Sequence, residues 1–173
     1  RDRVRLNDGG GGTTVSSFNV QVNNLAPTIR QVIANNPSSE GSETVFDVLG
    51  YDPGQDPLTF RFDFDQDGLF DVTNDTGSAT YIYPEDGSYN VLIEVSDDRG
   101  ESARIEYPIS VRNLSPTIDE ITVSDQPKEG AVTTFEVSAR DPGRFDLLTY
   151  EFDLDGEAGF EISQSSPLLR HTF

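Results

Sequence analysis

The residues best suited to chemistry form one short acidic segment, DFDQDGLFD, at positions 63–71. Its four carboxylates occupy the first, third, fifth and ninth places and belong to Asp63, Asp65, Asp67 and Asp71. A hard cation such as Ca²⁺ takes about six to eight oxygen ligands at about 2.3–2.6 Å, and alternate residues of a tightly curled loop can point inward together. Gly68 would supply the sharp turn, and the carbonyl of Leu69 would be a further ligand. The segment therefore predicts a calcium site.

A second acidic segment repeats this pattern at 153–161. Its predicted ligands are the side chains of Asp153, Asp155, Glu157 and Glu161 and the carbonyl of Gly159. A Glu side chain is longer than that of Asp, and Gly156 comes one place earlier than its counterpart, so we expect this site to be weaker.

The same carboxylates could instead belong to solvated loops of an acidic protein. Neighbouring carboxylates repel by about 1 kcal/mol per pair at about 4 Å even in water. Without a cation they should move apart or take up protons. Position 12 of the first segment is Asn74 rather than Glu, and no helical pattern flanks it, so the segment is not an EF-hand.

Composition removes several other kinds of chemistry and partner. The 173-residue chain has 31 acidic and 12 basic side chains and a net charge of −19, so we expect no nucleic-acid partner and no attraction to anionic membranes. It has no Cys, and Lys128 and His171 are its only Lys and His, which leaves little for nucleophilic or general-base catalysis. No apolar run approaches the roughly 20 residues of a membrane span, so we expect no membrane insertion. The sequence offers no convergent catalytic set, so we expect no enzyme activity.

Apolar residues alternate with polar ones in the segments 60–64, 91–95 and 105–111, which predicts strands with one buried face. No window has a sustained helical period. Clusters of Pro, Gly, Asn and Asp recur about every 8–12 residues, as they do in antiparallel sandwiches. The sequence therefore predicts an all-β fold rather than disorder.

The chain also repeats itself. NLAPTI at 24–29 returns as NLSPTI at 113–118, an offset of 89 residues, and LTFRFD at 58–63 returns as LTYEFD at 148–153, an offset of 90. A repeat of this length can bury two facing sheets. We predict a complete module at 24–112, the front of a second at 113–173, and the last two strands of another at 1–23.

Three arrangements could complete the module begun at 113–173. The chain could be an excerpt of a longer tandem array. Its residues 1–23 could complete the next molecule by strand complementation, which repeated head to tail gives an open filament. They could also fold back onto 113–173 of the same chain. In each case something must cover the open sheet edges and half-exposed core of this segment.

Taken together, these motifs resemble the PKD (polycystic kidney disease) repeat, and the resemblance covers nearly the whole chain. It rests on NLAPTI, the Asp-Pro-Gly at 52–54, the aromatic-Asp-Phe segment at 62–64, a Gly-x-Tyr turn and VSDDRG at 95–100. It implies tandem immunoglobulin-like (PKD-like) β-sandwiches, one complete and one split between the two chain ends. Phe62 stands where the family has Trp, which leaves cadherin-like and other immunoglobulin-like modules as alternatives. The acidic segments themselves are similar to the calcium loops of thrombospondin and dockerin modules.

The resemblance also implies a second kind of calcium site, at one end of each sandwich. In the complete module its candidate ligands are Asn24, Asp52, Asp56, Asp97 and Asp98. In the split module they are Asn113, Asp141 and Asp146, with Asp8 donated by the other chain end. The alternative is that these residues only form turns, because Asp-Pro-Gly and paired Asp residues are typical of them.

What the resemblance implies is a role rather than a reaction. We expect a calcium-stabilised structural or adhesive repeat of a secreted or cell-surface protein, able to assemble head to tail into a filament by strand complementation. The alternative is a non-catalytic binding or spacer module of a larger secreted hydrolase. The expected partners are neighbouring copies of the chain or adjacent repeats, and an extracellular protein or glycan.

Overall fold

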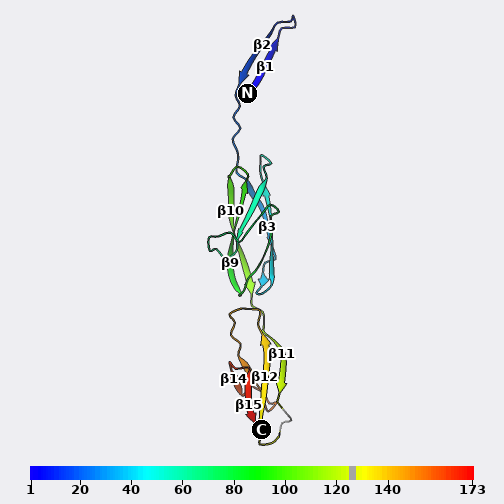
Figure 1. The fold of residues 1–173 in the computed structure, drawn as a ribbon, viewed down its shortest axis with the longest axis vertical. Helices are drawn as coiled ribbons and strands as arrows, with labels where there is room; N and C mark the ends of the chain where they lie inside the picture. Colours follow the sequence, from blue (N-terminus) through cyan, green and yellow to red (C-terminus); the bar gives the residue numbers. More distant parts are fainter. Residues whose placement is uncertain (125–127) are drawn as a thin grey trace.

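In a computed structural model, the chain forms three β units in a row (Figure 1). The structure describes residues 1–124 and 128–173, and within them every regular element is a strand, which confirms the all-β prediction. The strands, in chain order, are β1 (Asp2–Asn7), β2 (Thr13–Phe18), β3 (Thr28–Ala34), β4 (Ser38–Ser39), β5 (Glu43–Tyr51), β6 (Leu58–Asp63), β7 (Val72–Asn74), β8 (Ser78–Ile82), β9 (Gly87–Asp97), β10 (Ser102–Arg112), β11 (Thr117–Val123), β12 (Val132–Arg140), β13 (Tyr150–Phe152), β14 (Ile162–Gln164) and β15 (Leu168–Thr172). The described residues contain no helix of the length and apolarity that crossing a bilayer would need.

The first unit is a separate hairpin of β1 and β2. The two strands pair antiparallel from Asp2 opposite Phe18 to Asn7 opposite Thr13, and neither pairs with any other described strand. Every residue of both strands is exposed. The hairpin lies at the opposite end of the molecule from β11–β15 (Figure 1), so within one chain it does not fold back onto residues 113–173.

The second unit is a complete sandwich of two facing sheets. One sheet has the strand order β3-β5-β8, and the other has the order β4-β10-β9-β6-β7. The alternation read from the sequence sends the rings of Phe60, Phe62 and Phe64 inward, where they are between 0% and 6% exposed. Phe46 from the opposite sheet lies 5.2 Å from Phe64 between ring centroids. Burial of these rings between two sheets is the main source of stability in this unit.

On the outer face of the same sheet, Arg61 of β6 lies directly opposite Glu94 of β9. Their Nη1 and Oε1 atoms are 3.1 Å apart, and Arg104 of β10 contacts the second oxygen of Glu94. Glu94 is only 3% exposed, so these two partners balance its charge.

The third unit is a sandwich with only part of its strands. Its sheets are β11-β12-β15 and β13-β14, which are the counterparts of β3-β5-β8 and β6-β7. Both copies have the same bulge, between Ile29 and Gln31 in β3 and between Ile118 and Glu120 in β11. The described part of the 113–173 unit has no counterpart of β9 or β10.

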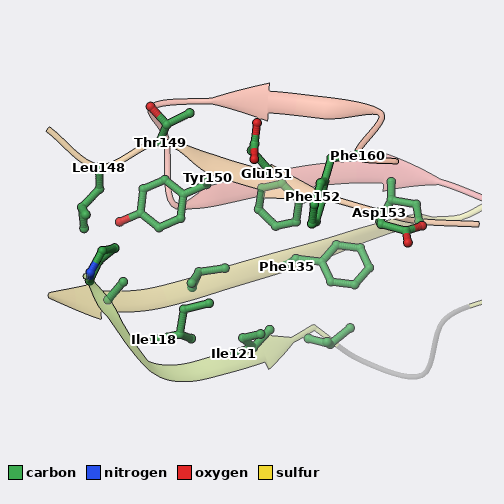
Figure 2. A pocket seen from close by; sticks show the side chains of 15 residues that line it. Ile118, Ile121, Phe135, Leu148, Thr149, Tyr150, Glu151, Phe152, Asp153 and Phe160 are labelled. Atoms are coloured by element: carbon green, nitrogen blue, oxygen red, sulfur yellow. The ribbon is translucent and has the colours of Figure 1, made fainter. Parts of the chain in front are cut away.

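Because those two strands are missing, the core of the third unit is open. An apolar groove of about 550 Å³ lies between its sheets. Figure 2 shows Leu148, Tyr150 and Phe152 pointing into this groove toward Ile118 and Ile121. Ile118 and Ile121 are 62% and 57% exposed.

A pair of matched truncations tests this description. We expect Phe62→Ala to lower the free energy of unfolding by about 3–5 kcal/mol, because it empties a fully enclosed position. Phe152→Ala, at the equivalent place in the open sandwich, should cost less than about half as much, because its ring is already partly in water. Urea unfolding of dilute protein followed by circular dichroism measures both. Equal losses would contradict an open third unit.

Candidate metal centres

The loop between β6 and β7 brings three of its predicted ligands together. Carboxylate oxygens of Asp63, Asp65 and Asp71 all lie within 4.8 Å of one another. Asp63 is the last residue of β6, and the backbone amide of Asp71 donates to the carbonyl of Phe62 at 2.8 Å, which closes the loop. The side chain of Asp71 also accepts the amide of Phe64 at 2.8 Å. The strand ends therefore hold three carboxylates at the spacing that a cation needs.

We call these three residues the 63/65/71 group. Asp63 is its buried member. Its side chain is 2% exposed, and its Oδ2 accepts the amide of Gly68 at 3.2 Å. Its Oδ1 is buried and has no hydrogen-bond partner among the described residues. A buried, unpaired carboxylate oxygen is costly in free energy, and a cation bound in the loop would remove that cost.

Two predicted ligands of this loop are not brought into the group. Asp67 stays outside it, because its Oδ1 accepts the amide of Leu69 at 2.8 Å and so shapes the turn. The carbonyl of Leu69 remains a prediction. Gly68 has a φ of 90°, a conformation that side chains disfavour, in agreement with the turn expected there.

Burial and the negative charge of the loop both raise the pKa of two nearby tyrosines. Tyr81 stacks on Phe64, with 4.6 Å between ring centroids. Burial raises the pKa of Tyr81, and the negative charges of Asp65 and Asp71 raise it further. The pKa of the neighbouring Tyr83 is also raised, first by burial. The carboxylates of the loop thus add to the effect of burial on the pKa of Tyr81.

The 153–161 loop reproduces the same arrangement in the open sandwich. Oxygens of Asp153, Asp155 and Glu161 lie within 4.8 Å of one another, and all three side chains are exposed. The amide of Leu154 donates to Glu161 at 2.9 Å, as the amide of Phe64 does to Asp71. Glu157 lies outside the group, and its amide donates to Asp155 at 2.8 Å. The carbonyl of Gly159 remains a prediction.

A third group, the 52/56/97 group, lies at the end of the complete sandwich where the hairpin linker enters. Oxygens of Asp52, Asp56 and Asp97 lie within 4.8 Å of one another. Asp52 is 5% exposed, and its Oδ2 is buried without a hydrogen-bond partner among the described residues. This group therefore has the same unpaired buried oxygen as the 63/65/71 group.

Hydrogen bonds from three N–H groups stabilise the ionised form of Asp97. The side-chain amide of Asn24 donates to its Oδ2 at 2.6 Å, and the amides of Arg99 and Glu101 donate to its Oδ1, each at 2.9 Å. Burial acts to raise the pKa of Asp97, but these hydrogen bonds outweigh burial and lower the pKa below its ordinary value. Asp98, the other candidate at this strand end, is exposed and lies outside the group.

The fourth group joins the two sandwiches. The donation of Asp8 by the other chain end to Asn113, Asp141 and Asp146 remains a prediction. In the structure, Asp8 lies on the distant hairpin, where its Oδ1 accepts the amides of Gly10 and Gly12. Asp146 instead meets Glu40 and Glu85 of the preceding sandwich, with oxygens within 4.8 Å of one another. We call this set the junction group.

Glu40 organises the junction group from a fully buried position. Its two oxygens accept the amides of Leu114 at 2.6 Å and Asp86 at 3.0 Å, so they tie the start of the next unit to this one. With its nitrogen turned toward the carboxylates, the amide of Asn113 donates to Glu40 at 2.8 Å and to Asp146 at 3.1 Å. Desolvation, together with the charges of Glu40, Asp141 and Glu85, raises the pKa of Asp146.

Sequence reasoning missed Glu40 and Glu85. Neither belongs to an acidic motif, and both lie in the module before the one that carries Asp146. Only contacts between the units bring them to this place, including the amide of Arg144, which donates to the carbonyl of Pro84 at 2.9 Å.

Comparisons with known proteins bear on the fold and the family. The model of the PKD domain family matches residues 24–111. Among solved structures, the chain is similar to the PKD domain of an M14-like peptidase from a Thermoplasmatales archaeon, with 15% identity and a TM-score of 0.43, over 51% of this chain and 98% of that one. It is also similar to carbohydrate-binding modules of the β-sandwich superfamily, with 20% identity and a TM-score of 0.44, over 67% of this chain and 59% of that one. Fibronectin(III)-like modules of CbhA from Clostridium thermocellum match with 15% identity and a TM-score of 0.40, over 85% of this chain and 78% of that one.

The lowered pKa of Asp97 predicts how stability depends on pH. Above the ordinary Asp value of 3.8, the folded and unfolded chains both carry this charge, and the hydrogen bonds contribute their full stability. As the pH falls below 3.8, the unfolded chain takes up the proton first, so this contribution declines until the pH has passed the lowered folded pKa. Asp97→Asn should flatten the acid limb of the stability profile measured by urea unfolding. The exposed neighbour variant Asp98→Asn is the control and should leave the profile as it is in the native chain.

Proposed function

This chain belongs to the PKD domain family, and from that premise we propose that it is a calcium-stabilised structural or adhesive repeat of a secreted or cell-surface protein. PKD domains are typically non-catalytic modules with a structural or binding role. To this role the proposal adds a bound Ca²⁺ ion, the carboxylates that hold it and the stiffening of the chain that it causes.

The observation that carries the proposal is a pair of buried, unpaired oxygens. One is Oδ1 of Asp63 and the other is Oδ2 of Asp52, and each lies within a separate group of three carboxylates. Hydrogen bonds satisfy the remaining oxygen of each side chain, so these two are left for a ligand. A divalent cation is the ligand that pairs such an oxygen and offsets the repulsion within its group.

The chemistry of these groups favours Ca²⁺ over other ions. All the charged ligands are carboxylates, with neither His nor Cys among them, which suits a hard cation rather than zinc or copper. Ca²⁺ also tolerates irregular geometry and varied ligand number better than Mg²⁺ does. Backbone carbonyls such as that of Leu69, together with water, would complete the shell, in the manner of thrombospondin and dockerin loops.

Ion binding would stiffen the chain as well as stabilise it. The 63/65/71 and 52/56/97 groups each join segments at the ends of strands, and the junction group spans two units. Extracellular calcium modules bind with Kd values of about 10⁻⁴–10⁻³ M, so such sites are filled where calcium is plentiful, outside cells. The proposal therefore includes an extracellular location.

Assembly into a filament is part of the same proposal. Among the described residues, the 113–173 sandwich has an open core, and the β1–β2 hairpin pairs with no other strand (Figure 1). Head-to-tail contacts give closed rings when the rotation between copies closes and open filaments when it does not, and the proposal is the open filament.

Chelation tests the proposed function. We expect EDTA to lower the Tm of the chain and added CaCl₂ to restore it, with about 2.7 kcal/mol of stabilisation when calcium is at a hundredfold excess over Kd. Asp63→Asn should reduce the effect, because it removes a charge from the 63/65/71 group while the 52/56/97 group keeps its three carboxylates. Asp75→Asn, on an exposed turn after β7, is the matched control and should keep the full response. The same Tm in EDTA and in CaCl₂ would refute calcium stabilisation.

A further inference from the structure

One of the four carboxylate groups has a basic side chain of the chain itself beside it. Nε of Arg99 lies 3.8 Å from Oδ2 of Asp56, a member of the 52/56/97 group. The other ion pairs among the described residues involve Glu94 and Asp119, which belong to none of the groups. The 52/56/97 group therefore differs electrostatically from the 63/65/71 group.

Arg99 contacts the outermost carboxylate of this group and leaves the innermost one unpaired. Asp56 is half-buried, whereas Asp52 and Asp97 are buried. Oδ1 of Asp52 accepts the amide of Asp56 at 3.1 Å, and Oδ2 of Asp52 has no hydrogen-bond partner among the described residues. The positive charge of Arg99 thus lies on the solvent side of the group, and the buried oxygen is still free for a ligand.

A guanidinium group is too large to take the place of a metal ion between these oxygens. The three carboxylates offer oxygens within 4.8 Å of one another. A Ca²⁺ ion fits that spacing, because it binds oxygens at about 2.3–2.6 Å. The planar guanidinium carries its N–H donors on its edge, so it pairs with carboxylates from one side. Arg99 can therefore reduce the negative charge of the group from outside but cannot fill its centre.

The side chain of Arg99 can leave without disturbing the turn that carries it. It is 59% exposed, and an exposed ion pair of this length contributes little stability. The turn is held through the backbone instead, because the amides of Arg99 and Glu101 donate to Oδ1 of Asp97, each at 2.9 Å. A change in the Arg99 side chain therefore leaves the ligand geometry of Asp97 in place.

The group is open to an ion on the side where Arg99 lies. A surface depression of about 300 Å³ is lined there by Asn24, Gly54, Asp56 and Arg99, among others. A methyl group on Gly54 would lie 3.0 Å from Oδ2 of Asp56 and 3.1 Å from Oδ1 of Asp52, so the glycine keeps the space beside these oxygens free. Arg99 and an incoming cation therefore approach Asp56 from the same opening.

We propose that Arg99 is a built-in competitor of the divalent cation at the 52/56/97 group. Its guanidinium offsets part of the negative charge when no ion is bound, and it moves into solvent when Ca²⁺ enters. Arg99 thereby stabilises the ion-free unit and lowers the calcium affinity of this site. The inference rests on the proposed function, because it names the residue that regulates one of the proposed calcium sites.

A CaCl₂ titration followed by ¹H–¹⁵N correlation spectra tests this role at each site separately. The amide of Glu101 donates to Asp97 and reports on the 52/56/97 group, while the amide of Phe64 donates to Asp71 and reports on the 63/65/71 group. We expect Arg99→Gln to lower the calcium midpoint at the Glu101 amide by about tenfold, because a repelling positive charge is gone. The midpoint at the Phe64 amide should stay as it is in the native chain.

Two control variants separate the position of the charge from the net charge of the chain. Arg99→Lys keeps a positive charge at the same place and should keep the midpoint at the Glu101 amide within about threefold of the native value. Arg170→Gln removes one charge from an exposed side chain on β15, in the third unit, and should change neither midpoint. An equal drop in all three variants would overturn a specific role for Arg99.

Thermal unfolding distinguishes competition with the ion from a purely structural ion pair. We expect Arg99→Gln to lower the Tm in EDTA, because the ion-free group loses its one positive neighbour among the described residues. The rise in Tm on adding CaCl₂, at a concentration equal to the native midpoint, should be larger than in the native chain. A lower Tm in EDTA with an unchanged rise would mean that Arg99 is only structural, and it would overturn the inference.

The inference and the proposed function fail in different ways. If both amides respond to CaCl₂ and Arg99→Gln shifts neither midpoint, the role of Arg99 is rejected and calcium binding is kept. If only the Phe64 amide responds, the 52/56/97 group is not a calcium site, and the inference falls while the 63/65/71 site stands. If neither amide responds, the proposed function and the inference are both rejected.

Discussion

The architecture depends on one constraint: a β-sandwich excludes water from its core only when both facing sheets have their full set of strands. In the complete unit, β9 and β10 finish the second sheet, and Phe62 is fully buried. In the 113–173 unit the counterparts of these strands are missing from the described residues, and the same kind of ring lines an open groove. The exposure of the groove side chains thus reflects an incomplete second sheet among the described residues.

Closure of the sandwich also determines where negative charge collects. Loops at the ends of strands bring together residues that are distant in sequence, and in this chain those loops are rich in Asp and Glu. Among the described residues, Asp52, which follows β5, and Asp63, the last residue of β6, are buried with one oxygen each left without a hydrogen-bond partner. Strand ends thus place these charges where their burial costs free energy.

The junction shows how one unit is oriented on the next. Glu40 is buried and accepts amides from both sides of the boundary, at Asp86 and at Leu114. Asp146 adds a third carboxylate there together with Glu85, and its raised pKa reflects desolvation and their mutual repulsion. Direct hydrogen bonds across the boundary therefore define the orientation of the two units.

The strands, the repeat and the first acidic loop could be predicted from the sequence, because each depends on the spacing of nearby residues. Period-two alternation indicated the strands, the offset of 89 to 90 residues related the two modules, and the 63–71 spacing brought Asp63, Asp65 and Asp71 together. The tertiary structure alone decided which of two adjacent residues joins a group, since Asp97 is held by donors from the next turn while Asp98 faces solvent. It alone brought Glu40 and Glu85 to Asp146, because packing between units has no signature in the spacing of any one segment.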